Sequence, residues 1–371
     1  MGKRELLLVI GFVVAGAVLY HATAPPPPPG SEGFSVSRII QQARRAVQGN
    51  RAQVDVESTR TEAIDASIEE LHLTVRSVEV TVIGEARTDV QFGMKVNSTG
   101  YDPKEARQYA EATELKIDRA GPSLAAEIKY PRQARQRAWL TVRVPSRLRV
   151  RLEPSSGRLT IANVAAVEGT AAGGPATLTN IAGPVTLNLR GVPLAVDGAA
   201  SLRLTGRGVE TKLQRVTGMA IVQSNGGDLT LSAITGPLEI ESRNTDVRVE
   251  QIRHLKAPLR VNATNGSVRI AGLRTEARID GNDTDLDIVL DAPAPVTIYS
   301  TSQDITVTPP AAGYTVDAVA TDGRITIDDG SIHASGDTNE QRASGSVRGG
   351  GATLTLRATR GDILVRPPAG K

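Results

Sequence analysis

The stretch Val222-Gln-Ser-Asn-Gly-Gly-Asp-Leu-Thr-Leu231 joins a polar turn to alternating apolar residues, and altered copies of it return along the chain. Asn, Gly and Asp favour left-handed or side-chain-bonded turns, and period-two alternation is typical of short strands. The same frame, strand then turn then strand, fits residues 237–249, 258–270, 295–307, 315–327 and 353–365. We therefore interpret the stretch as one corner of a repeating structural element.

The first apolar residue after each turn gives the length of the repeat. Successive steps in the middle of the series are about twenty residues, a period typical of solenoids. The residue before the turn is small, as expected for an inward-facing corner. The first apolar residues are Leu159, Val185, Val209, Leu229, Val247, Val268, Leu286, Ile305, Ile325 and Ile363. The small residues are Ser224, Ser242, Ala263, Gly281, Ser300, Ala320 and Ala358.

These patterns predict an all-β fold, a parallel β-solenoid (β-helix) of about ten coils over residues 154–366, followed by a tail at 367–371. Aromatic residues make up only 3% of the chain, so the core is expected to consist of Val, Ile, Leu and Ala. A β-sandwich built from ordinary hairpins is the structural alternative, because it also contains short strands at regular spacing.

Residues 69–153 are predicted to form the N-terminal cap of the solenoid. Residues 71–75 and 78–82 alternate as a first pair of strands, and residues 103–114 predict one inserted helix with Asp102 as its N-cap. Residues 330–351, rich in Ser, Gly and Asp, double the spacing before the last coil. We expect a loop or a mobile hairpin there.

The N-terminus is predicted to anchor the chain in a membrane. Lys3 and Arg4 precede an uninterrupted apolar run, and counting from Leu6 through Ala24 gives roughly 28 Å of helix, close to the ~30 Å hydrocarbon core. Residues 1–24 are therefore expected to form one transmembrane signal-anchor with its N-terminus in the cytoplasm. The body is then periplasmic or extracellular. A cleaved signal peptide is the alternative, although Pro25 would follow the scissile bond.

Two connecting segments are predicted after the anchor. Five consecutive prolines followed by Gly-Ser-Glu-Gly indicate a stiff spacer over residues 25–33. Residues 34–68 are expected to contain a basic amphipathic helix and a connector, since apolar residues recur there at helical spacing among arginines.

Composition and residue spacing favour no catalytic, cofactor or metal site. The chain has 43 basic and 40 acidic residues, which argues against nucleic-acid binding, and no cysteine. Its four histidines have no second histidine or carboxylate at the spacing of a metal or acid–base site. The acidic cluster of Asp280, Asp283, Asp285 and Asp287 lacks the glycine and distal glutamate of a calcium loop. We interpret these aspartates as turn and surface residues.

One basic stripe is a candidate binding surface. Arg149 and Arg151 alternate with Leu148, Val150 and Leu152, which predicts that the arginines point outward. Contact with an anionic envelope polymer is the functional interpretation, and a solvated surface is the structural one. The candidate residues are Arg143, Arg147, Arg149 and Arg151.

Several of these motifs together resemble a known family. The segments Leu140-Thr-Val-Arg-Val-Pro145 and Ser156-Gly-Arg-Leu-Thr-Ile161, followed by serial Gly-Asp-Leu or Gly-Asp-Ile coils, resemble the bacterial putative-adhesin domain family of unknown function. The resemblance covers residues 69 to 366 and implies a membrane-tethered or surface β-solenoid without established catalytic residues.

The sequence therefore predicts a membrane-tethered, non-catalytic interaction or structural module. An envelope polymer or a protein is the expected partner. The alternatives are a carbohydrate-active β-helix enzyme and an envelope-stress or signalling accessory protein.

Overall fold

The computed structural model describes residues 12, 15–16, 52–131, 136–256 and 258–367. Most of the predicted signal-anchor at 1–24, and all of the predicted linker and helix through residue 51, lie outside the described residues. Within the described part of the chain, no helix is long and apolar enough to cross a membrane. The chain divides into two compact units; the first includes Asn97–Ala112, and the second includes Glu57–Val96, Thr113–Tyr130 and the residues from Arg137 onward.

The first unit contains the predicted inserted helix, α3 (Pro103–Glu111). The Asp102 carboxylate accepts a hydrogen bond from the backbone N–H of Glu105 (2.8 Å), and the Glu105 carboxylate accepts one from the N–H of Tyr101 (2.7 Å). This reciprocal capping satisfies N–H groups that an α-helix leaves free at its start. The predicted N-cap is therefore confirmed, and the helix ends at Glu111 rather than at residue 114.

The remaining elements are strands. The N-terminal ones are β1 (Ala52–Ala63), β2 (Glu70–Thr74), β3 (Val78–Glu85), β4 (Asp89–Gly100), β5 (Glu114–Ala120), β6 (Ser123–Lys129), β7 (Gln136–Pro145), β8 (Arg149–Ser156) and β9 (Leu159–Ala162). The middle ones are β10 (Ala166–Ala172), β11 (Ala176–Arg190), β12 (Leu194–Arg207), β13 (Thr211–Val216), β14 (Ala220–Ser232), β15 (Leu238–Glu250), β16 (Leu259–Leu273) and β17 (Ala277–Leu290). The C-terminal ones are β18 (Val296–Thr301), β19 (Ile305–Thr308), β20 (Tyr314–Thr321), β21 (Ile325–Ile327), β22 (Ser335–Gly336), β23 (Glu340–Val347), β24 (Thr353–Thr359) and β25 (Ile363–Val365). Strand β1 lies in the part of residues 34–68 that was predicted as a connector, and the predicted amphipathic helix lies outside the described residues.

Each coil of the second unit contributes one strand segment to each of two ladders. Ladder A contains, in spatial order, β6, β2, β8, β10, residues 185–190, 202–207, 220–225, 238–243, 259–264 and 277–282, then β18, β24 and β20. Ladder B contains β7, β3, β9, residues 176–179 and 194–197, β13, residues 229–232, 247–250, 268–271 and 286–289, then β19, β25 and β21.

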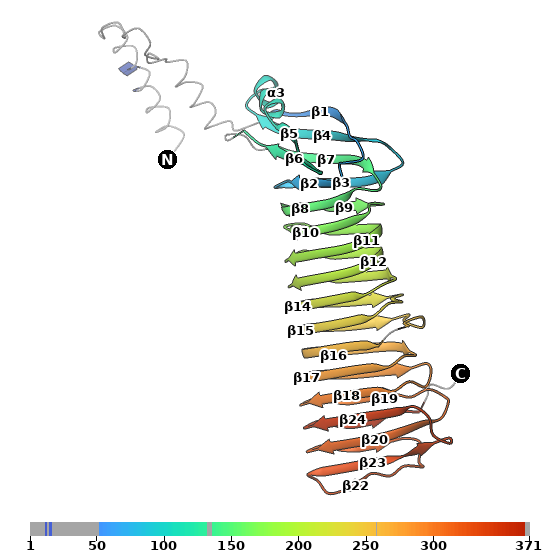
Figure 1. Ribbon diagram of the computed structural model, residues 1–371. Coiled ribbons are helices and arrows are strands. Elements are labelled where there is room, and N and C mark those ends of the chain that lie inside the picture. Colours follow the sequence, from blue (N-terminus) through green and yellow to red (C-terminus); the bar gives the residue numbers. More distant parts are fainter. Residues whose placement is uncertain (1–11, 13–14, 17–51, 132–135, 257, 368–371) are drawn as a thin grey trace. The chain divides into compact units, whose positions relative to one another are not determined.

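Neighbouring coils in the middle pair in parallel and in register. Leu229 pairs with Val247, which pairs with Val268, and the same residue of every coil stacks on its equivalent in the next (Figure 1). Hairpins of a sandwich would pair antiparallel. The predicted parallel stacking is therefore confirmed for these coils, and the sandwich alternative is wrong there.

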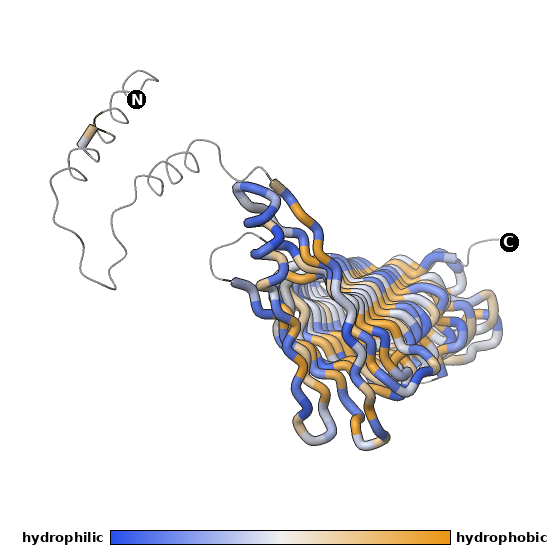
Figure 2. Tube along the Cα trace, turned by 90° about the horizontal axis from the view of Figure 1, so that it is seen from above, coloured by the Kyte–Doolittle hydropathy of each residue, from blue (hydrophilic) through white to orange (hydrophobic). Residues whose placement is uncertain are grey.

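Alternation along each strand builds the core. Viewed from above, hydrophobic and hydrophilic positions alternate along the tube (Figure 2). Leu238, Ile240 and Ser242 of β15 are buried, whereas Glu241 between the last two is exposed. Aliphatic side chains thus stack in continuous rows inside the coils, and polar side chains stack in rows on the outer surface.

The corner between ladder A and ladder B has the composition that the sequence predicted. Asn244 and Asn265 have φ values of 49° and 56°, a left-handed conformation that Asn adopts more readily than most residues. The amide of Asn265 donates to the Asn244 side-chain oxygen (3.2 Å). The small residues stack in register beside this corner, and a Cβ on Gly281 would lie 3.1 Å from the Leu286 side chain.

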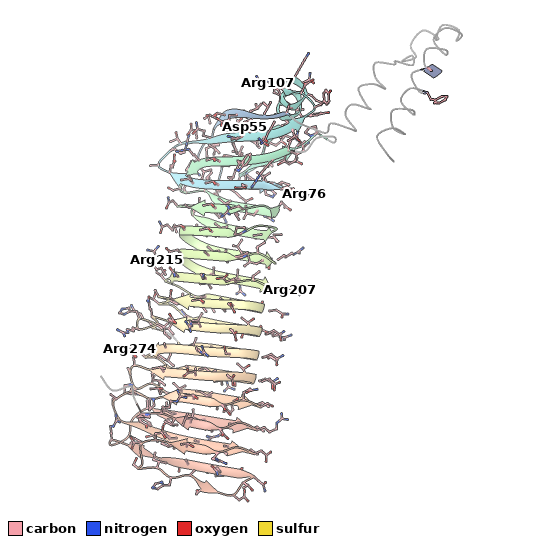
Figure 3. The ribbon with its side chains drawn as sticks, turned by 180° about the vertical axis from the view of Figure 1, so that it is seen from behind. Asp55, Arg76, Arg107, Arg207, Arg215 and Arg274 are labelled. Atoms are coloured by element: carbon pink, nitrogen blue, oxygen red, sulfur yellow. The ribbon has the colours of Figure 1, made fainter. Side chains whose placement is uncertain are left out.

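The two corners lie at opposite margins of the coils. Figure 3 shows Arg76 and Arg207 at one margin of the strands and Arg215 and Arg274 at the other. Left-handed residues occur at the second corner too, including Asn163 (φ 59°) and Asn180 (φ 52°).

The predicted repeat positions fail in one region. Val185 and Val209 were expected to follow the turn into ladder B, but Val185 lies on ladder A, paired with Val167 and Leu202. Ladder B at these coils instead contains Ala176, Leu194 and Thr211. The sequence frame therefore slips between residues 163 and 217.

The N-terminal end of the solenoid does not follow sequence order. Strand β2 pairs in parallel with β6 on one side and β8 on the other, and β3 likewise lies between β7 and β9. The coil made of β2 and β3 is thus placed between two coils that follow it in the chain (Figure 1). Strand β5 covers the outer edge of β6 by antiparallel pairing.

The C-terminal end repeats this arrangement in reverse. Strand β24 pairs with both β18 and β20, and β25 pairs with both β19 and β21. The last coil of the chain therefore lies between two earlier coils. Residues 330–351, predicted as a loop or hairpin, contain the hairpin strands β22 and β23, and β23 pairs antiparallel with β20.

Candidate functional site

The structure separates the four arginines of the predicted basic stripe. Arg143 lies on β7 in ladder B, Arg149 and Arg151 lie on β8 in ladder A, and Arg147 lies in the turn between them. The outward direction of Arg149 and Arg151 agrees with the predicted alternation, since both are exposed and Val150 between them is buried.

Three of these arginines have acceptors within the protein. Arg143 pairs with Glu85 (2.8 Å) and Arg149 with Glu69 (3.0 Å). Arg147 donates to two backbone carbonyls, those of Ile68 (2.5 Å) and Asp65 (2.9 Å), and so ties the turn to the preceding segment. Exposed pairs of this kind contribute at most about 1 kcal/mol each.

Arg151 is placed differently from the other three. In the register of ladder A it stands directly beside His72 on one side and Glu168 on the other. Within the described residues its side chain makes no hydrogen bond or ion pair. The acidic residues Glu69, Glu85 and Glu168 lie next to these arginines, so the surface is less positive than the sequence alone indicates.

A second surface, which the sequence reasoning missed, is a groove on the outer side of ladder A. Its main hollow has a volume of about 420 Å³, and an adjoining hollow of about 240 Å³ shares Gln223 and Glu241 with it. The residues that contribute outward side chains to this "ladder A groove" are Thr205, Arg207, Ile221, Gln223, Asn225, Glu239, Glu241, Arg243, Arg260, Asn262, Arg278 and Asp280.

Strand periodicity and register explain why these side chains meet. Glu239 and Glu241 are two residues apart on β15 and therefore point to the same side of the sheet. In the neighbouring coils Glu239 stands beside Ile221 and Arg260, and Glu241 beside Gln223 and Asn262. Each of these coils thus adds two or three outward side chains to the groove.

The charged groups in the groove face opposite charges or amides. Arg278 donates to both carboxylate oxygens of Asp280 (2.9 and 3.1 Å), and this hydrogen bonding raises the pKa of the Arg278 guanidinium. Arg260 lies 3.8 Å from Glu239, and the Gln223 amide donates to Glu241 (3.1 Å). The groove therefore has polar groups of both signs.

An aromatic ring extends the groove by one coil. Tyr299 pairs in register with Asp280, and its ring centroid lies 4.9 Å from the Arg278 guanidinium. The residue is 40% exposed, which is high for a large aromatic side chain. Such a ring offers a flat apolar surface next to the polar row.

The acidic cluster noted in the sequence is divided between different sides of the coil. Asp280 lies in the ladder A groove, Asp283 has a left-handed conformation at the corner (φ 48°), Asp285 directly precedes ladder B, and Asp287 lies on it. Across the described ranges, no group of three or more His, Cys, Asp or Glu residues is placed to hold a metal ion.

A further hollow lies at the second corner. It has a volume of about 730 Å³, and Glu250, His254 and Asp291 are among its lining residues. The Arg253 guanidinium reaches the Asp291 carboxylate (3.2 Å) past Gly272. Arg253 and Asp291 therefore satisfy each other's charge, and they lie beside the small residues Ala271 and Gly272.

Comparison with known proteins identifies the family. A model of the family described as Toastrack DUF4097 matches residues 68–366. The chain belongs to this family. The resemblance to an adhesin-like family of unknown function is thereby confirmed, and the matched residues include the coils of both ladders and the closed C-terminal end.

One solved structure is similar to this Toastrack chain. It is a crystal structure from Clostridium sporogenes with the name "putative cell adhesion protein", and it shares 10% sequence identity. The match covers 85% of this chain and 100% of that chain, with a TM-score of 0.19. No curated protein matches the chain.

Proposed function

We propose that this Toastrack protein is a membrane-tethered, non-catalytic module that presents its solenoid outside the cytoplasmic membrane to a component of the cell envelope. The ladder A groove carries the proposal, because it offers outward polar side chains from successive coils on a rigid parallel sheet. Sites on regular elements hold their side chains more precisely than sites on loops.

The arrangement of the carboxylates supports binding rather than glycoside hydrolysis. A hydrolase of that class needs one carboxylic acid that keeps its proton near neutral pH. The groove carboxylates Glu239 and Asp280 are instead engaged with arginines, at 3.8 Å from Arg260 and 2.9 Å from Arg278 respectively. This environment is suited to accepting hydrogen bonds from a ligand.

The N-terminal sequence supports the tethered location. Its basic residues precede an apolar run long enough to approach the hydrocarbon thickness, and the following prolines act as a spacer. We infer that the N-terminus stays in the cytoplasm and that the solenoid is periplasmic or extracellular.

Fractionation of cells that express the full chain tests this location. We expect the protein to remain with membranes after a wash in about 1 M NaCl, because salt at that concentration screens charge contacts beyond about 3 Å but leaves an inserted helix in place. N-terminal sequencing should begin at or near Met1. A soluble mature protein beginning at Pro25 would show that the segment is a cleaved signal peptide.

A further inference from the structure

We propose that the ladder A groove, from Thr205 to Tyr299, is the binding site for a linear, uncharged glycan that lies along the stacking direction of the coils. This inference names the ligand class of the interaction module and so rests on the proposed function. It concerns a surface distinct from the arginine stripe at 143–151.

The direction of the ligand follows from the register. Neighbouring strands of a sheet are about 4.8 Å apart, so a ligand crossing the coils meets a new pair of outward side chains at that interval. The pairs are Ile221 with Gln223, Glu239 with Glu241, Arg260 with Asn262, and Arg278 with Asp280. A regular row of this kind is suited to an extended polymer with repeating polar groups.

The chemistry of the row fits hydroxyl groups. A hydroxyl donates one hydrogen bond and accepts others, so its recognition requires both kinds of partner. Glu239 and Glu241 supply acceptors, Arg260 supplies donors, and Asn262 supplies both. Four adjacent coils thus present donors and acceptors in alternation.

The aromatic end adds a contact that polar side chains cannot provide. The axial C–H groups of a pyranose ring form an apolar face, which packs against an aromatic ring. Tyr299 has the required exposure, and its contact with Arg278 restricts the ring's orientation. Ile221, one coil from the opposite end, adds a second apolar contact.

Charge selects an uncharged ligand over a polyanion. Arg278 pairs with Asp280, Arg260 lies 3.8 Å from Glu239, and Arg243 lies 3.8 Å from Glu241. Three of the four groove arginines thus face a carboxylate, and Arg207 is the fourth. A strongly anionic polymer would meet a carboxylate beside each of these three arginines, so the groove gives it little net attraction.

Isothermal titration calorimetry of the full chain in detergent tests the inference, with chitohexaose and cellohexaose as neutral probes and polyglutamate as the anionic probe. We expect saturable binding of a neutral hexaose with a Kd below about 1 mM, unchanged between low and high salt, because uncharged ligands do not respond to screening. Tyr299→Ala and Glu241→Ala should each weaken it at least tenfold.

The matched control is Thr306→Ala on ladder B, which belongs to the same coil as Tyr299 but lies on the other ladder. This variant should bind like the original chain. Circular dichroism of each variant shows whether its fold is retained. For a variant that does not fold, Tyr299→Leu keeps an apolar side chain but removes the ring.

Three results would overturn the inference: no saturation by either hexaose, equal loss of binding in the Thr306 control, or binding of polyglutamate alone. If polyglutamate alone bound, and this binding were lost in the double variant Arg149→Gln with Arg151→Gln, the envelope contact would be assigned to the arginine stripe instead. None of these results alters the fractionation outcome, so failure here and failure of the proposed location remain distinguishable.

Discussion

The middle of the solenoid and its two ends are built from the same kind of coil but are joined by different rules. In the middle, each coil pairs with the coils immediately before and after it in sequence, as β14, β15 and β16 do. At each end, one coil lies between neighbours that are out of sequence order. The repeat therefore determines how a coil is shaped, whereas the ends determine where the stack stops.

The ends also differ from the middle in how they treat exposed strand edges. A parallel stack could accept another strand at either end, which is a hazard for aggregation. Here β5 covers β6 and β23 covers β20, both by antiparallel pairing. The change of strand direction interrupts the pattern that a further parallel coil would need.

The largest expected effect is the difference in thermal stability between deleting a whole coil and deleting half a coil in the middle of the solenoid. Deleting residues 229–246 joins Asp228 to Val247, and since Asp228 pairs with Asp246 and Leu229 with Val247, every inward residue stays inward. We expect this variant to fold with a moderately lower melting temperature, because the stability of a solenoid is roughly a sum over its coils and their interfaces.

Deleting residues 229–237 instead joins Asp228 to Leu238, so a ladder A strand enters ladder B. We expect this variant to lose its cooperative transition. Thermal unfolding followed by circular dichroism compares the two. A collapsed whole-coil deletion beside a stable half-coil deletion would contradict the coil boundaries described above.

The next largest expected effect is a loss of hydrogen-exchange protection at the C-terminal end when its last two strands are removed. Removing residues 352–371 takes away β24 and β25 and leaves β18 and β20 about two strand spacings apart, roughly 10 Å. It also removes Arg357, which donates to the Asp317 carboxylate (2.6 Å). We expect β18 to β23 to lose hydrogen-exchange protection, while the middle coils keep theirs.

The matched control removes only residues 368–371, which follow the last strand. Its exchange pattern should equal that of the full chain. If the longer truncation keeps full protection in β20, the interposed coil does not hold the end together.

The sequence predicted the middle well because its corners are chemically explicit. Asn244 and Asn265 mark left-handed positions, and small residues mark the inner corner. Between residues 163 and 217 the frame slipped, because Thr211 occupies an inward position where an apolar residue was expected and Arg215 takes the left-handed corner. There the residue types no longer distinguish one corner from the other.

Neither the order of the ends nor the groove could be predicted in this way. Alternation shows that Leu354 and Val316 face inward, but both strands would fit any neighbouring coil, so pairing order depends on three-dimensional closure. Alternation likewise shows that Glu241 and Asn262 face outward. That they stand side by side depends on which residues pair between coils, and paired residues are 21 positions apart here but 18 positions apart in the preceding coil.

The smallest expected effect is a change in the free energy of unfolding when a left-handed corner residue is replaced by glycine, either at the C-terminal end or in the middle. Arg360 has φ 59° at the C-terminal end, and Asn265 has φ 56° in the middle. We expect Arg360→Gly to stabilise the protein by about 0.5–1 kcal/mol, since glycine adopts this conformation without the steric cost that a side chain incurs. Asn265→Gly should give no gain, because it removes the hydrogen bond to Asn244.

Urea unfolding of both variants and the original chain measures the difference. Arg360 keeps its backbone hydrogen bond to the Thr321 carbonyl (2.7 Å) in the glycine variant, so the conformation itself is the quantity that changes. An equal response at both positions would indicate that the strain is not specific to the end.

The interposed last coil also determines when the chain can finish folding. A ribosome releases residues in sequence order, and domains usually begin to fold at their N-terminal side during synthesis. Here β18 and β20 are complete long before Leu354 and Ile363 emerge, yet the space between them belongs to those residues. The coil of β24 and β25 can therefore insert only after both of its neighbours have been synthesised, so the native pairing of β18 and β20 has to wait for residues that follow them in the chain.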